Sequence, residues 1–297
     1  MSDEEVASSV GIPMNWNDHE GWDTYYEAWY RSRGTPVLSF RDSLRFSGKL
    51  FQIQRFQVLG WKKLWFPGCG VSLLPAVYAA FGFDVWASDV SRSAIEFQGS
   101  LPPPAQFVSR MLSEQGGIEE DVIQQANQAG ELHFQNHDFR SDFPERDFDC
   151  ILNDRAFQGL PLDSMRRAAT VHWRALKPGG HAFFYTNNLQ GGDRTLVEDA
   201  LLQAGFYVPH HDTERWYRET LDSTGIETVF AGGVQARFTF TDGEAMEGKM
   251  ERHRQNQAIL DRICQEYEKR IKQEKEKVDI TLKDGMTKVA CMYHSTG

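Results

Sequence analysis

Two glycines and a carboxylate in the stretch LWFPGCGVSLLPAVYAAFGFDVWASDVS, Leu64 to Ser91, have the types and spacing to bind a nucleotide-sized ligand. Gly68 and Gly70 allow the backbone to turn tightly and to approach a ligand closely. Asp89 follows the next apolar segment, and a carboxylate there can accept two charge-assisted hydrogen bonds from a ribose diol. We therefore interpret the stretch as half of a binding site for an adenosine group.

The spacing of small residues in this turn bears on which adenosine cofactor it would bind. In the dinucleotide fingerprint G-x-G-x-x-G, the third small residue lets a helix pack closely on the strand and receive a pyrophosphate. Leu73 takes that place here, and Ser72 is small instead. This gives the G-x-G-x-[GS] spacing associated with S-adenosylmethionine. A glycine pair alone is weak evidence, because an ordinary strand-to-helix turn can also contain one.

The elements that must position these residues form a strand, a helix and a second strand. Leu64 to Phe66 is a short apolar run typical of a buried strand, and Leu73 to Phe81 has the apolar spacing of a helix packed on a sheet. Phe83 to Ala87 then predicts another strand. Asp89 is expected at the carboxyl end of that strand, where open α/β sheets bind their ligands.

Later segments continue the alternation of helices with apolar strands. The expected strands are Leu132–Asp138, Phe148–Leu152, His181–Thr186, Gly205–Val208 and Val234–Phe240; the expected helices are Leu162–Leu176 and Arg194–Ala204, with a breaker at Lys177–Gly180. Helices interleaved with short apolar strands predict a doubly wound α/β protein with a mostly parallel sheet.

With these segments in order, the chain resembles the class I S-adenosylmethionine-dependent methyltransferases, and within them the thiopurine methyltransferase-like group that includes halide and thiol methyltransferases. The segments that carry the resemblance are YEAWYRSRGTPV (Tyr26–Val37), FPGCG (Phe66–Gly70), FDVWASDVSRSAIEF (Phe83–Phe97) and NDRAFQGLPLDSMRRAA (Asn153–Ala169). The likeness runs from roughly Tyr26 to Phe240 with gaps. It implies a Rossmann-like methyltransferase fold with about seven strands, an N-terminal lid helix and a long C-terminal helix.

The resemblance also implies roles for individual residues that match the motifs. The implied cofactor-binding residues are Trp29, Phe66, Pro67, Gly68, Cys69, Gly70, Asp89, Val90, Asp138, Phe139 and Asn153. Among them, Gly68 and Gly70 would face the methionine part, Asp89 would hold the ribose, and Asp138 with Phe139 would border the adenine. Asn153 would lie beside the sulfonium and Trp29 would cover it. The candidate catalytic residues are Asp154, Arg155 and His210, and no metal is expected. The chain departs from the family pattern at Phe157, in lacking a glycine or lysine just after the turn, and over Gly99–Gly130.

Methyl transfer from a sulfonium mainly requires that a nucleophile be aligned behind the methyl carbon and that water be excluded. A thiolate, selenide or halide acceptor needs no base, whereas a hydroxyl or ammonium acceptor must lose a proton. The candidate pocket residues are Asn153, Asp154, Arg155, Tyr185, Asn187, Asn188, His210 and His211. Arg155 could hold an anionic substrate or pair with a neighbouring aspartate. The two histidines could supply a base or lie on the surface.

Two further segments flank the expected sheet. An aromatic cluster precedes the glycine turn, with Trp16, Trp22, Tyr25, Tyr26, Trp29 and Tyr30 at helical intervals. Most of these rings are expected to pack on the body, while one or two could cover the sulfonium, because aromatic faces attract cations. From Glu244 to Val278 charges of both signs surround an apolar face, which predicts a long helix that is either solvated or paired with a partner.

The composition sets limits on partners and compartment. A net charge of −10 opposes nonspecific binding to nucleic acid or to an anionic membrane. The four cysteines are scattered, so neither a zinc site nor a disulfide framework is indicated. With no apolar run long enough to span a bilayer and an acidic start, we expect a cytoplasmic protein. The expected divisions are residues 1–60 as an entry and lid segment, 61–241 as the methyltransferase domain, and 242–297 as a charged helix and tail.

Three classes of function remain open on the sequence. The first is a methyltransferase of a small molecule, with an S-methylated, thiol-like product favoured by the resemblance and O- or N-methylation as alternatives. The second is a methyltransferase of nucleic acid or protein, which the negative charge and the sequence NDRA at Asn153–Ala156, in place of N/D-P-P-Y/F, argue against. The third is a noncatalytic module that binds S-adenosylmethionine. The chain is expected to be a monomer or a homodimer through its C-terminal helix.

Overall fold

The computed structural model describes residues 19–33, 40–106, 108, 124, 130–154, 156–157, 160–186, 192–224, 228–230, 234–236 and 246–294. The chain forms two compact units. The first unit contains the residues up to Tyr207 together with Lys288–Ser295, and the second contains Val208–Thr287 and the last two residues. The second unit is therefore inserted into the first near its carboxyl end.

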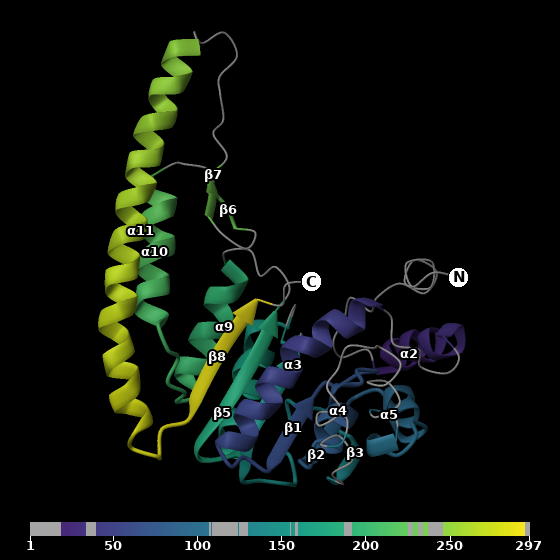
Figure 1. Ribbon diagram of the computed structural model, residues 1–297. Coiled ribbons are helices and arrows are strands. Elements are labelled where there is room, and N and C mark those ends of the chain that lie inside the picture. Colours follow the sequence, from purple (N-terminus) through teal and green to yellow (C-terminus); the bar gives the residue numbers. More distant parts are fainter. Residues whose placement is uncertain are drawn as a thin grey trace. The chain divides into compact units, whose positions relative to one another are not determined.

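A six-stranded parallel sheet forms the centre of the first unit (Figure 1). Its strands are β1 (Lys63–Pro67), β2 (Asp84–Asp89), β3 (Leu132–Asn136), β4 (Phe148–Asp154), β5 (Leu176–Thr186) and β8 (Val289–His294). Their spatial order is β3-β2-β1-β4-β5-β8, and each neighbouring pair is parallel. Because the chain runs outward from β1 to β3 and then returns to the other side of β1, the order reverses between β1 and β4. The predicted α/β class with a parallel sheet is confirmed.

Among the described residues of the first unit, six helices pack on or near this sheet. They are α2 (His19–Arg33), α3 (Phe40–Val58), α4 (Leu74–Ala80), α5 (Arg92–Gly99), α8 (Leu162–Ala175) and α9 (Gly192–Gln203). Helix α4 packs on β2, α5 on β2 and β3, α8 on β5, and α2 packs on α5. The helices predicted after β1, after β4 and after β5 all form.

Alternate residues of the central strands face opposite layers. Leu64 and Phe66 of β1 are buried in a core that includes Ile53 and Phe56 of α3. Trp65, between them, faces the other way and its ring lies 5.0 Å from that of His172 on α8. A strand buried on both faces must be apolar throughout, and this explains why LWF reads as a continuous apolar run.

The last strand of the sheet is not the one that the sequence predicted. Val234–Ala236 forms β7, which pairs antiparallel with β6 (Thr228–Phe230) in a separate two-stranded sheet of the second unit. The place beside β5 is taken by β8, in which Val289 and Ala290 are buried. In the part of the chain that the structure describes, the main sheet therefore has six strands rather than about seven.

Two other expectations about strands also need correction. Gly205–Val208 contributes a single parallel bridge, between Tyr207 and Val289, instead of a full strand. The predicted breaker Lys177–Gly180 lies within β5 as an irregularity, because the register shifts between Phe148 and Cys150 of β4. Gly179 has a φ of +70° there, a conformation that glycine adopts without strain.

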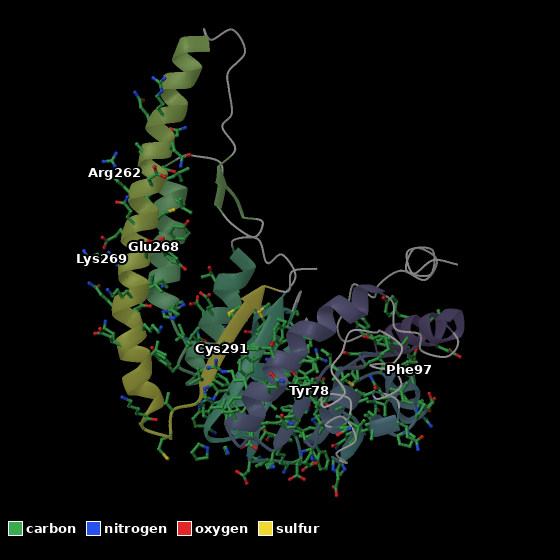
Figure 2. All side chains as sticks on the ribbon, viewed as in Figure 1. Tyr78, Phe97, Arg262, Glu268, Lys269 and Cys291 are labelled. Atoms are coloured by element: carbon green, nitrogen blue, oxygen red, sulfur yellow. The ribbon has the colours of Figure 1, made fainter. Side chains whose placement is uncertain are left out.

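The described part of the second unit includes helices α10 (His211–Ser223) and α11 (Met246–Leu282). They pack through a small core in which Tyr217 and Leu221 of α10 contact Leu260 and Ile263 of α11. Figure 2 labels three exposed charged residues on α11, Arg262, Glu268 and Lys269. The predicted C-terminal helix is thus present. None of the helices described here is both long and apolar enough to cross a membrane.

Candidate functional site

The turn after β1 depends on two glycines that tolerate no side chain. Gly68 has a φ of +62° and Gly70 a φ of +49°, values that L-residues with a Cβ rarely adopt. A Cβ on Gly68 would lie 2.5 Å from the Cβ of Ala156, and one on Gly70 would lie 2.6 Å from the hydroxyl oxygen of Tyr26. Both positions therefore require glycine for conformation and for space.

Asp89, at the carboxyl end of β2, joins this turn to the next strand. The backbone N–H of Gly70 donates to its Oδ2 at 2.8 Å, and that of Ser91 donates to its Oδ1 at 2.9 Å. A carboxylate has about four lone-pair sites, so it can accept more hydrogen bonds than these two. The side chain is buried at 5% exposure. The role of Asp89 as an acceptor for a ribose diol stays a prediction.

The protonation of Asp89 reflects this burial. Desolvation raises the pKa of the carboxyl from 3.8 to about 6, although the N–H groups of Ser91 and Gly70 oppose the shift. The nearby carboxylate of Asp23 adds to the increase. Near neutral pH the group is ionised and can act as an acceptor, while mild acid protonates it.

The end of β3 holds the segment that follows Asp89. Nδ2 of Asn136 donates to the carbonyl oxygens of Asp89 and Val90, at 3.0 and 2.8 Å. The backbone N–H of His137 also donates to the carbonyl of Asp89, at 2.8 Å. The carbonyl oxygen of Val90, a predicted cofactor-binding residue, is therefore held by Asn136. The carboxyl ends of β2 and β3 form one hydrogen-bonded edge.

Gln98 on α5 supports the glycine turn, and the sequence analysis missed it. Its Nε2 donates to the carbonyl oxygens of Gly70 and Ser72, at 3.0 and 2.6 Å. The residue is 1% exposed. Its position four residues after Ala94, on the buried face of α5, was the available signal, because a glutamine among buried residues must bond to something polar.

Helix α2 lies against the same turn. Oδ1 of Asp23 accepts hydrogen bonds from the hydroxyl of Ser91 at 2.6 Å and from the N–H of Ser93 at 3.0 Å. The hydroxyl of Tyr26 is beside Gly70, and its ring stacks on that of Trp22 with centroids 5.8 Å apart. Packing of the aromatic helix on the body is confirmed for these rings. The side chain of Trp29 lies outside the described residues, so its cofactor-covering role stays a prediction.

Two residues after β3 were predicted to border an adenine. Phe139 is buried, and its ring lies 3.4 Å from the position that a Cβ on Gly68 would take. Asp138 is bound by the guanidinium of Arg140, with N–O distances between 2.7 and 3.0 Å. Phe139 therefore lies at the glycine turn, and the carboxylate of Asp138 is oriented by its arginine neighbour.

A buried histidine supports the end of β4. Nε2 of His172 lies 3.4 Å from Nδ2 of Asn153, and its Nδ1 lies 2.6 Å from the carbonyl oxygen of Ala168. Burial lowers the pKa of His172 to about 3, so the imidazole is neutral. Nδ1–H then donates to Ala168, and Nε2 accepts from Asn153. His172 thereby orients the Asn153 amide, a function that the sequence alone did not indicate.

A polar network lies at the end of β5. The hydroxyl of Tyr185 accepts from Nε2 of Gln52 at 2.6 Å, and the hydroxyl of Tyr78 donates to Oε1 of Gln52 at 2.7 Å. Nζ of Lys49 lies 3.7 Å from the centre of the Tyr185 ring. Asp154 pairs in register with Tyr185, so the network reaches the predicted catalytic end of β4.

The remaining predicted pocket residues are not brought together by the described part of the chain. Arg155, Asn187 and Asn188 lie outside the described residues. His210 belongs to the second unit, where its Nδ1 lies 3.0 Å from Oε2 of Glu274. His211, in the same unit, is buried at the start of α10. Their proposed catalytic roles stay predictions.

Two of the four cysteines are buried in the first unit. Cys69 follows Gly68 in the turn, and Cys150 lies in β4. Burial raises the pKa of both thiols well above the usual value. Thiols held neutral in this way are poor nucleophiles, so the predicted role of Cys69 rests on its backbone. Its N–H donates to the carbonyl of Ser88 at 3.0 Å.

Comparison with known proteins finds likeness in structure only. No protein-family model and no curated protein sequence matches this chain. Magnesium protoporphyrin IX methyltransferase from Synechocystis PCC 6803, solved with bound S-adenosylmethionine, is 13% identical over 64% of this chain and 84% of its own, with a TM-score of 0.41. A TehB-like S-adenosylmethionine-dependent methyltransferase from Corynebacterium glutamicum is 15% identical over 63% and 83%, with a TM-score of 0.40.

A third similar structure comes from work on the conversion of a disulfide bond into a thioacetal group during echinomycin biosynthesis. It is 20% identical over 43% of this chain, with a TM-score of 0.30, and the chain spans 45% of that protein. Similarities at these TM-scores carry no conclusion about this chain.

Proposed function

We propose that this chain is an S-adenosylmethionine-dependent methyltransferase of a small molecule. The observation that carries the proposal is the hydrogen bond from the N–H of Gly70 to Oδ2 of Asp89, 2.8 Å long. It joins a glycine turn and a buried acid at the carboxyl ends of adjacent parallel strands. These strands lie beside the point where the strand order reverses, which is where open α/β sheets bind their ligands.

The residues at the carboxyl ends of these strands suit an adenosine cofactor with an amino-acid tail. Asp89 has acceptor capacity left for a ribose diol, and Phe139 offers an aromatic face beside Gly68. Asn153, Phe66, Pro67 and the main chain of Cys69 would line the methionine end. Helix α2 supports a covering role for the N-terminal segment, because its Tyr26 already contacts the turn.

A dinucleotide cofactor fits this turn less well. Helix α4 begins at Leu74 with Pro75 in its first turn, and proline lacks the N–H that a pyrophosphate would accept there. The capping residue Leu73 also has no side chain that could help to bind a phosphate. These features support S-adenosylmethionine over NAD.

The bound cofactor would supply an electrophilic methyl group on a sulfonium. The task of the protein is then to hold the acceptor in line behind that methyl carbon and to exclude water, which can remove about 7 to 11 kcal/mol from the barrier. The acceptor would form a bond to the methyl carbon as the bond from that carbon to the sulfonium sulfur breaks, giving the methylated product and S-adenosylhomocysteine. An acceptor that arrives protonated would also give up its proton. Asp154, Arg155 and His210 are the residues we propose to position or deprotonate it.

We propose a thiol-like acceptor, for which the sequence resemblance is the support. A thiolate needs no strong base, and His172, the buried histidine nearest the end of β4, is neutral and already bonded on both nitrogens. O- or N-methylation of a small metabolite is the alternative, and would need a base from another position.

A noncatalytic binding module is the second candidate. It is favoured by the exposed, mixed-charge face of α11, which includes Arg262, Glu268 and Lys269 and would suit a partner or a second copy of the chain. We propose a monomer or a homodimer through this helix, in the cytoplasm, with no nucleic-acid partner.

Calorimetry and a product assay test these proposals. Titration with S-adenosylhomocysteine should give saturable binding, and titration with NAD should not. Asp89→Ala should weaken binding by more than about 1.5 kcal/mol, because a charged acceptor is lost. Asp163→Asn, on the exposed surface of α8, should leave it unchanged. The cofactor assignment would be refuted if the protein bound NAD but not S-adenosylhomocysteine. It would also be refuted if Asp89→Ala bound S-adenosylhomocysteine as tightly as the wild type.

Release of S-adenosylhomocysteine in the presence of thiols, phenols, amines or halides separates an enzyme from a module. Turnover with a thiol, and not with a phenol or an amine of similar size, would support S-methylation. Binding without turnover on any acceptor would favour the module instead.

A further inference from the structure

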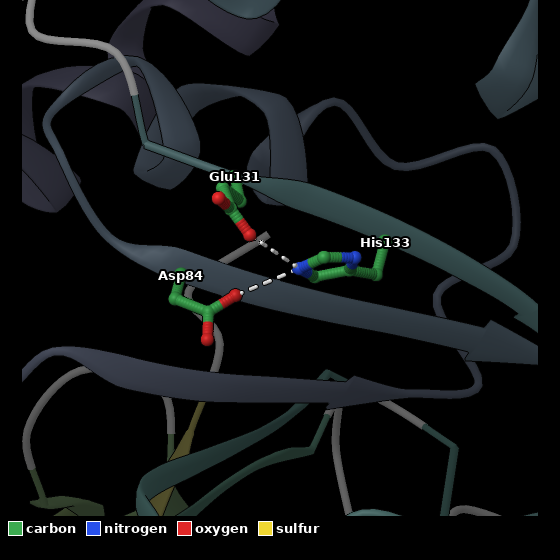
Figure 3. Close-up of side chains that lie close together, drawn as sticks. All are labelled: Asp84, Glu131 and His133. Carbon is green, nitrogen blue, oxygen red and sulfur yellow. Dashed lines mark hydrogen bonds and ion pairs between the residues drawn. The ribbon is translucent and has the colours of Figure 1, made fainter.

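We propose that Asp84, Glu131 and His133 form a binding site for a divalent transition-metal ion of the Zn²⁺ class. Figure 3 shows the two carboxylates directed at one nitrogen of the imidazole. The three ligand atoms lie within 4.8 Å of one another, and no ion is present. The site lies at the amino ends of β2 and β3, away from Asp89 and Asn136 at their carboxyl ends, so this proposal is independent of the methyltransferase assignment.

The register of the two strands brings these residues together. Trp86 of β2 pairs with His133 of β3. Side chains alternate along a strand, so Asp84, two residues before Trp86, and Glu131, two residues before His133, belong to the same face of the sheet. The residues between them, Val85 and Leu132, point to the opposite core. The cluster therefore follows from strand pairing across a long sequence separation.

The distances within the cluster suit direct coordination. Nε2 of His133 lies 3.0 Å from Oδ1 of Asp84 and 3.3 Å from Oε2 of Glu131. Zinc binds nitrogen and carboxylate oxygen at about 2.0 to 2.2 Å in a tetrahedron, whose edges between ligand atoms are then about 3.3 Å long. Nε2 of His133 already has nearly this separation from both carboxylate oxygens, which lie within 4.8 Å of each other, so side-chain rotations would admit the ion.

Neighbouring groups orient the imidazole and leave the site accessible. The His133 ring stacks on that of Trp86, with centroids 4.3 Å apart and an interplanar angle of 23°. This packing fixes the ring plane so that Nε2 faces the carboxylates. The side chains of His133, Asp84 and Glu131 are 35%, 40% and 78% exposed, which lets an ion enter from solvent.

The donor set selects the class of ion. Mg²⁺ and Ca²⁺ prefer oxygen ligands alone, whereas an imidazole with carboxylates suits Zn²⁺ and its transition-metal neighbours. The two carboxylates carry negative charge that a divalent cation would cancel, and an imidazole that binds a metal adds no charge. Three protein ligands would leave the fourth tetrahedral position to water.

The expected effect of the ion is structural. It would tie the edge strand β3 to β2 and would bind the folded state more tightly than the unfolded chain, where Asp84 is far from Glu131 and His133. Ligands of this kind raise the melting temperature in proportion to the logarithm of their concentration above the dissociation constant. Metal should therefore raise stability without changing affinity for the adenosine cofactor.

The test uses the full-length chain after metal removal. Calorimetry and thermal unfolding measure the binding of Zn²⁺, and visible absorption measures the binding of Co²⁺. One equivalent should bind with micromolar affinity or better, raise the melting temperature and give Co²⁺ bands. His133→Phe keeps a ring to stack on Trp86 but removes the ligand, and should weaken binding at least tenfold and abolish the temperature shift. Glu96→Gln is the matched control, because its exposed carboxylate pairs with Nε of Arg92 at 2.9 Å on α5 instead.

Two outcomes would overturn the proposal. The first is the absence of saturable binding in the micromolar range. The second is unchanged binding in His133→Phe, which would place the ion elsewhere. If His133→Phe does not fold, Glu131→Gln replaces it, because that side chain is largely exposed and should not affect folding.

Discussion

The main-chain N–H of Gly70 and the carboxylate of Asp89 are joined by a 2.8 Å hydrogen bond between the ends of two neighbouring strands. The position of each residue depends on the other. The positive φ of Gly70 turns its N–H toward β2, and burial places the carboxylate where it must find donors. The conformation of the turn thus directs a hydrogen-bond donor at the carboxylate of Asp89, and the charge of that carboxylate depends on pH.

Cofactor binding should weaken in mild acid. The pKa of Asp89 in the free protein is about 6, because burial disfavours its charged form. Above that pH the carboxylate accepts hydrogen bonds from a ribose; below it the group is protonated, and affinity should fall toward tenfold per pH unit. Calorimetry with S-adenosylhomocysteine between about pH 5 and pH 8 would measure this. Asp89→Asn should bind weakly and without this pH step, and a wild-type affinity independent of pH would contradict the ribose role.

Gly68→Ala should destabilise the fold more than Gly60→Ala. Both glycines have positive φ, +62° and +71°, so alanine is strained by about 1 kcal/mol or more at each position. A Cβ at Gly60 meets nothing within 4 Å, whereas one at Gly68 would lie 2.5 Å from Ala156. The additional overpacking should cost about 1 to 3 kcal/mol in urea unfolding. Equal losses in the two variants would mean that the turn can move away from Ala156.

Gln98→Met should weaken cofactor binding more than it lowers stability. The variant keeps the side-chain volume but removes the two donations to the carbonyls of Gly70 and Ser72. Each lost hydrogen bond costs about 1 kcal/mol, and the loosened turn should raise the dissociation constant roughly tenfold. Gln57→Met removes a comparable bond, to Phe81 at 3.1 Å, at the other end of α4, and serves as the control. A similar change in affinity for both variants would argue against a specific role for Gln98.

The part of the fold that was predictable is the part encoded in local pattern. The strand, turn, helix and strand from Lys63 to Asp89 follow one another without a long loop, so periodicity and glycine placement were sufficient. Strand β8 was missed because the whole second unit separates it from the rest of the sheet. Nothing local shows that Val289–His294 returns to pair with β5.

The site was predicted less completely than the fold, for a related reason. Asp89 could be identified from its position after a strand. The contacts of Gln98 and the cluster of Asp84, Glu131 and His133 depend on which elements pack together and in which register. A buried polar residue on a helix signals that some partner exists, but the sequence does not say which one.

His172→Phe should change how stability depends on pH. The folded pKa of His172 is about 3, and its unfolded value is near 6.5. Below about pH 6.5 only the unfolded chain takes up this proton, so the free energy of unfolding falls by up to about 1.4 kcal/mol per pH unit as the pH decreases. Asp89 acts in the opposite direction between its folded pKa of about 6 and its unfolded value near 3.8, so the two groups partly cancel in the wild type.

The difference between wild type and His172→Phe isolates the histidine, because Asp89 is common to both. The two proteins can differ in free energy of unfolding at neutral pH. As the pH falls from about 7.5 to about 5, that difference should change by about 2 kcal/mol in favour of the variant. Urea unfolding at several pH values measures this difference directly. A difference that stays constant over the range would show that His172 can be protonated in the folded state, and that Asn153 is then not held by a neutral imidazole.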